Sequence, residues 1–154
     1  MKRVVTILAV FLAVVIVVLL GVLVFVKPAH SPIISSPLQG DCSASSGCPT
    51  VVSPSVGAII SSPVAVNGWI TGGGWFFEGS FPIKVIDADG TVLGQGPAQA
   101  QPPENWTSTG TVIFIGNISF AKPHSATGTI VLSKDNPSGL PQNDASLSVA
   151  VKFQ

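Results

Sequence analysis

The chain has 154 residues, a formal net charge of zero and only 9 % charged residues. The length leaves room for one domain with appendages, and the lack of a basic excess excludes a nucleic-acid-binding surface. Residues 51–154 carry four lysines against six acidic residues, a net charge of 4 − 6 = −2, and a segment of this size can bury a self-sufficient core.

An apolar run over residues 4–26 follows the short basic start Met1–Arg3. About 23 residues of helix extend roughly 34 Å, enough to cross a hydrocarbon core of about 30 Å. We therefore expect residues 1–27 to form a membrane anchor whose partner is the lipid bilayer. A cleaved signal peptide is the alternative, but its apolar region is usually about 7–15 residues long, and Lys27–His30 makes a poor cleavage site.

The basic residues at the two ends of this run predict its orientation. Lys2, Arg3 and the terminal amine outweigh the single Lys27, which favours a cytoplasmic N-terminus. The expected localisation is the cell membrane, as a single-pass protein whose C-terminal domain is extracytoplasmic.

Residues 28–50 are rich in serine, proline and glycine without a hydrophobic period, which is typical of a linker. Cys42 and Cys48 both lie in this segment. In an exported linker they could close a small disulfide loop, or they could remain two free thiols. A metal site is not expected, because His30 is the only other soft ligand nearby and four ligands are normally needed.

Residues 51–154 read as a series of short strands without an amphipathic helix. The expected strands cover residues 51–60 (broken around Pro54), 64–70, 81–86, 91–95, 111–120, 127–134 and 146–153, with a polar loop over residues 98–110. Alternation of apolar and polar residues marks the buried side of each strand. About seven such strands predict an all-β fold, an antiparallel β-sandwich, with a small barrel as the alternative.

The segment Trp75–Gly90 contains the most unusual run of aromatic residues. Trp75 and Phe77 share parity with the apolar residues of the following strand, so we expect them to be buried and Phe76 to be exposed. The parity of its own strand likewise exposes Trp69. Exposed aromatic side chains indicate a contact surface, unless a loop folds over them and completes a satellite core.

Few residues are suited to catalysis. His30 and His124 have no nucleophile at a recognisable spacing, and Glu78 alone is a weak candidate for glycoside hydrolysis. Asp87–Gly90 begins like a calcium loop but lacks the downstream oxygen ligands, so a hairpin turn is the simpler interpretation. We expect neither an enzyme nor a cofactor.

Several long motifs resemble the immunoglobulin-like domain of bacterial spore germination proteins, the GerMN-associated family. They are Trp75–Ile83, Val85–Gly90, Lys134–Pro141 and Val149–Phe153, and Trp106 occupies a place where the family tends to carry a tryptophan. The resemblance covers residues 51–154. It implies an extracytoplasmic immunoglobulin-like β-sandwich that binds a ligand or a protein at the cell envelope.

The candidate binding residues come from the aromatic residues and from these motifs. They are Trp69, Trp75, Phe76, Glu78, Trp106, Asp135 and Asn136. The expected function is a noncatalytic, membrane-anchored module for an envelope protein, a glycan or peptidoglycan. The alternative is a structural subunit of a membrane-bound envelope assembly, recruited through its helix or a sheet edge.

Overall fold

The computed structural model of this chain describes residue 42 and residues 47–154. This part of the chain contains no helix with the length and apolar character needed to cross a membrane. The predicted span over residues 4–26 lies outside the described residues. Residues 50–153 form the all-β domain that the alternation pattern predicts, and they also contain two short 3-10 helices that were not predicted.

Eight strands form one continuous hydrogen-bonded sheet in the order β1-β3-β6-β5-β4-β7-β8-β2. The strands are β1 (Thr50–Ser53), β2 (Ile59–Ile60), β3 (Val64–Thr71), β4 (Ser80–Asp87), β5 (Val92–Gln101), β6 (Thr111–Ile118), β7 (Thr127–Ser133) and β8 (Ser146–Phe153). The 3-10 helix η1 (Pro103–Thr107) follows β5, and η2 (Pro141–Asn143) precedes β8. All neighbouring strands pair antiparallel except β2 and β8, which are parallel.

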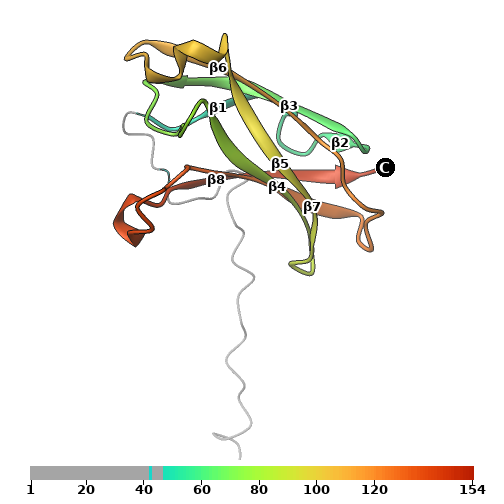
Figure 1. The fold of residues 1–154 in the computed structure, drawn as a ribbon. Coiled ribbons are helices and arrows are strands. Elements are labelled where there is room, and N and C mark those ends of the chain that lie inside the picture. Colours follow the sequence, from blue (N-terminus) through green and yellow to red (C-terminus); the bar gives the residue numbers. More distant parts are fainter. Residues whose placement is uncertain (1–41, 43–46) are drawn as a thin grey trace, which may run out of the picture. The chain divides into compact units, whose positions relative to one another are not determined.

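The sheet curls so that its two halves face each other across one core, and β5 joins them. β5 pairs with β4 over most of its length and with β6 through Ala98–Gln101. Figure 1 shows β5 running from the layer of β7 and β8 to the layer of β3 and β6. The expected two layers are therefore present, but they are connected by hydrogen bonds along one side. The expected polar loop over residues 98–110 is wrong at its start, where residues 98–101 extend β5 because Ala98 and Ala100 are buried.

Two prolines occur within this central hairpin, directly opposite each other. Pro82 of β4 faces Pro97 of β5, and because neither has an N–H, they fit only where this ladder needs no hydrogen bond between them. The pairing of β4 with β7 begins at Ile83, and that of β5 with β6 begins at Ala98. Each proline thus immediately precedes the stretch in which its strand acquires a second partner.

The first strand is divided as expected, and its two parts lie at opposite ends of the sheet. β1 pairs with β3, whereas β2 pairs with β8 after the turn around Pro54. This division raises the number of strands from the expected seven to eight.

The core is continuous between the two halves and follows the predicted parity. Val66 and Ile70 of β3, Phe114 of β6 and Val149 of β8 are buried, while their neighbours in sequence point outward. The largest fully buried side chains are Phe81, Phe114, Ile70, Ile83, Ile118, Ile130 and Leu132. Burial of these apolar surfaces is the main favourable contribution to folding.

Candidate binding surface

The aromatic segment before β4 forms part of the core. Trp75 and Phe76 are both buried, and each packs edge-on against Phe81, with ring centroids 5.9 Å and 5.2 Å away. Phe81 in turn contacts the ring of Phe114 at 5.2 Å. The packing of this cluster explains why the segment is rich in aromatic residues. Such edge-to-face pairs add stability beyond their buried area.

The expected exposure of Phe76 and burial of Phe77 were wrong, because the segment is a pair of turns and not a strand. The N–H of Phe76 donates to the carbonyl of Gly73, so strand parity does not apply. Phe77 and Ser80 then close a tight turn in which Glu78 and Gly79 both have positive φ. This turn directs Phe77 outward, with 43 % of its surface exposed.

Helix η1 packs against this aromatic end. Trp106 is half-buried and packs against the core, and its carbonyl oxygen would clash with a Cβ at Gly73. The N–H groups of Gly72 and Gly73 donate to the carbonyls of Gly110 and Ser108. A loop therefore folds against the aromatic segment. This arrangement was the alternative to an exposed contact surface that the sequence left open.

The remaining predicted site residues at this end are divided between a groove and a loop. Asp135 lies with Pro82, Gln95 and Pro97 along a shallow groove of about 380 Å³ on β4 and β5, and its N–H donates to the carbonyl of Trp75. Glu78 is exposed in its turn and does not line this groove.

The side chain of Asn136 holds the β7–β8 loop together. Its amide donates to the carbonyl of Leu140 at 2.9 Å and to Oδ1 of Asp144 at 2.7 Å. Its Oδ1 accepts a hydrogen bond from the hydroxyl of Ser138. These bonds occupy both ends of the amide and give Asn136 a structural role in the loop, while its binding role stays a prediction.

At the opposite end of the domain, the carboxylate of Asp87 joins two loops. Its Oδ1 accepts the N–H of Ala88 at 2.7 Å, and its Oδ2 accepts the N–H of His124 at 2.8 Å. The backbone donor of His124, assisted by Ser125 and Ala88 and opposed by burial, holds the pKa of Asp87 below its usual value.

The ligand atoms of Asp87, Asp89 and His124 lie within 4.8 Å of one another. Oδ1 of Asp89 accepts the N–H of Thr91, and the N–H of Gly90 donates to the carbonyl of Asp87. Gly90 has a φ of 91°, which favours glycine. The hydrogen bonds show that Asp87–Gly90 forms the hairpin turn between β4 and β5.

Trp69 belongs to a different surface, the outer side of β3 and β6. As predicted, it points away from the core, with 39 % of its surface exposed. It lies directly opposite Ile113, and Ile115 lies opposite Asn67 in the same ladder. Ile113 and Ile115 are 52 % and 49 % exposed. These two isoleucines were not among the predicted binding residues, although apolar residues occur at both odd and even positions of Thr111–Ile118.

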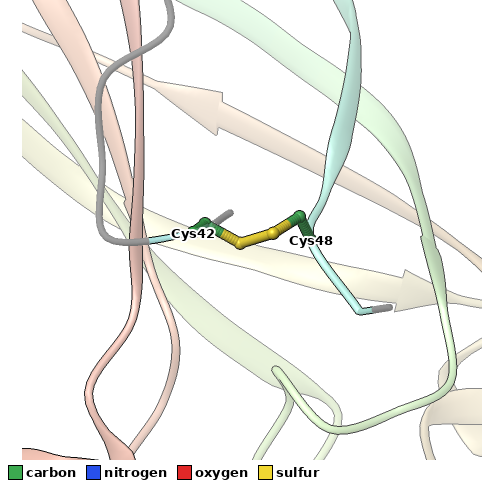
Figure 2. The surroundings of a disulfide bond; sticks show 2 residues. All are labelled: Cys42 and Cys48. Atoms are coloured by element: carbon green, nitrogen blue, oxygen red, sulfur yellow. A yellow bond between two sulfur atoms is a disulfide. The ribbon is translucent and has the colours of Figure 1, made fainter. Parts of the chain in front are cut away.

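A disulfide bond lies immediately before the first strand. Cys42 and Cys48 are bonded, with their Cα atoms 5.8 Å apart (Figure 2). The sequence left open whether these cysteines form a disulfide or remain free thiols, and the structure contains the disulfide. Cys42 also packs against the core, although its segment was expected to lie apart from the domain.

Comparison with known families agrees with this architecture. The family described as the immunoglobulin-like domain of bacterial spore germination matches residues 50–140, which include β1 to β7. Searches of curated proteins and of solved structures found no match. The chain belongs to the family of immunoglobulin-like domains of bacterial spore germination.

Proposed function

We propose that this chain is a membrane-anchored, extracytoplasmic immunoglobulin-like module that binds an envelope ligand or protein without catalysing a reaction. The observation that carries the proposal is the outer surface of β3 and β6, where Trp69, Ile113 and Ile115 remain exposed. A contiguous exposed apolar patch indicates an interaction site, whereas single exposed apolar residues need no explanation.

Two further observations support the proposed location. The apolar run over residues 4–26 is long enough to cross a bilayer, and the basic residues before it favour a cytoplasmic N-terminus. The disulfide between Cys42 and Cys48 is of a kind that forms and persists in oxidising compartments, outside the cytoplasm.

Cell fractionation and binding measurements test this function. We expect the full-length chain to sediment with membranes and to require detergent for release. In detergent micelles it should bind solubilised envelope extract in a saturable manner. Recovery in the soluble fraction without detergent would contradict the anchor, and the absence of saturable binding would contradict the binding role.

The sheet edges favour a second candidate, a structural subunit of an envelope assembly. Among the described strands, β1 pairs only with β3, and β2 covers only the end of β8 at Lys152 and Phe153. Exposed edges of this kind can add a strand from another chain. Replacing residues 4–26 by an unrelated anchor separates the two functions, because a ligand-binding module tolerates the exchange and an assembly organised within the bilayer does not.

A further inference from the structure

The outer face of β1, β3, β6 and β5 has an unusual composition for exposed strands. These four strands contain no charged residue. The lysines of the sheet lie elsewhere, Lys84 on β4 and Lys152 on β8. A face without charge offers nothing to an anionic polymer, whose binding depends on cationic side chains.

The strand register places amide side chains beside the exposed apolar ones. Ile113 lies between Trp69 of β3 and Gln101 of β5, and Ile115 lies between Asn67 and Gln99 in the neighbouring row. Three apolar side chains are thus bordered by three amides. We refer to these six residues as the amide face: Asn67, Trp69, Gln99, Gln101, Ile113 and Ile115.

The extent of the amide face argues against a large protein partner. A stable protein interface buries roughly 800 Å² on each partner and has a packed apolar centre. Even with Val52 of β1, which is 62 % exposed, the partly exposed side chains of Trp69, Ile113 and Ile115 provide much less than this. The face suits a narrower ligand that combines apolar surfaces with many hydrogen-bonding groups.

An uncharged polysaccharide has this combination. The C–H face of a sugar ring packs on an aromatic ring such as that of Trp69, and each amide both donates and accepts hydrogen bonds, as hydroxyl groups require. Adjacent strands are about 4.8 Å apart, which is close to the length of one pyranose ring. The steps from β3 to β6 to β5 therefore match the spacing of successive sugars.

The two isoleucines refine this assignment to acetamido sugars. An N-acetyl group joins a methyl group to an amide, and the face places Ile113 and Ile115 directly beside the amides of Gln101 and Gln99. From this geometry we infer that the amide face binds a neutral chain of N-acetylhexosamine units. The inference rests on the proposed binding function and specifies its ligand.

Titration of the full-length chain in detergent micelles with a pentamer of N-acetylglucosamine tests the inference. We expect saturable binding, and we expect the glucose pentamer, which lacks acetamido groups, to bind at least about tenfold more weakly. Trp69→Ala should weaken binding of the acetylated pentamer by about tenfold or more, because the stacking surface is lost.

Phe77→Ala is the matched control, since Phe77 is an aromatic residue of similar exposure that lies outside the amide face. It should leave the affinity unchanged. Gln101→Ala is a second variant that removes an amide without removing apolar surface, and it should also weaken binding. Circular dichroism of each variant reports whether the β-structure is retained.

The outcomes separate this inference from the proposed function. Equal affinities of Trp69→Ala, Phe77→Ala and the unaltered chain would overturn the amide face as the site while leaving a glycan-binding role. Failure to bind either pentamer, with protease-sensitive binding to envelope extract that Trp69→Ala abolishes, would overturn the glycan in favour of a protein partner. Failure to bind pentamer or extract would overturn both proposals.

Discussion

The inner and outer faces of β3 and β6 are built on the same two strands but have opposite roles. Val66, Ile70 and Phe114 point into the core, whereas Trp69 and Ile113 are exposed. The hydrophobicity of a residue does not distinguish the two faces, because both carry large apolar side chains. The face of each residue is decided by its odd or even position along the strand. This alternation separates residues that stabilise the fold from residues that remain available for contact.

The largest loss of stability is expected from substitution of the central aromatic residue on the inner face. Phe114→Ala removes a fully buried ring that contacts Phe81, and we expect a loss of about 3–5 kcal/mol in the free energy of unfolding. Denaturant titration of the full-length chain in micelles measures this change. A loss below about 1 kcal/mol would show that the ring is not essential to the core.

A smaller loss is expected where the inner face leaves no room for a side chain. A Cβ at Gly68 would clash with the carbonyl oxygen of Thr50 and would lie 2.7 Å from the ring of Phe114. Gly68→Ala should therefore cost about 1–3 kcal/mol through displaced backbone and side chains. Gly110→Ala is the control, because its Cβ would make an ordinary contact at 3.5 Å, and equal losses in the two variants would contradict the crowding.

The effect of pH distinguishes the buried carboxylate of Asp87 from the apolar core. Its lowered pKa means that its contribution to stability is fully present above the unfolded-state pKa and is lost as the pH falls through the folded-state pKa. Asp87→Asn should lower the melting temperature at neutral pH. The difference from the unaltered chain should shrink as the pH falls below about 4.

Thermal melts across this pH range measure the effect, with Asp89→Asn as the exposed control. A difference that stays constant with pH would mean that the charge of Asp87 does not contribute.

The smallest effect is expected for a matched change on the outer face. Ile113→Thr retains branching at Cβ and should change the free energy of unfolding by no more than about 0.5 kcal/mol. Threonine at the adjacent inner residue, Val112→Thr, buries a hydroxyl group and should cost about 1–3 kcal/mol. Similar values for the two neighbours would remove the distinction between the faces.

Strand parity could be predicted from the sequence, whereas turn geometry and distant polar partners could not. Period-two alternation correctly placed Trp69 outside and Phe114 inside. It failed for Phe76, because the glycine-rich turns before β4 interrupt the alternation. The hydrogen bond between Asp87 and His124 joins residues 37 positions apart and leaves no local signal in the sequence.

Only part of the candidate site could be predicted from the sequence. The sequence marked Trp69, but its amide neighbours Gln99 and Gln101 come from a segment expected to be loop. Their place beside Ile113 and Ile115 depends on the register of β5 against β6. Such a register is fixed by tertiary pairing and cannot be derived from either segment alone.

The division of the first strand has a mechanical consequence. Tension transmitted from the N-terminal side meets the loop closed by Cys42 and Cys48, then β1, and then β2. Because β1 is held by β3 and β2 by β8, a pull on the chain acts first on β1 at one margin of the sheet and reaches β2 at the other margin only after β1 has detached. Unravelling from this end must therefore detach both margins of the sheet before it reaches β3.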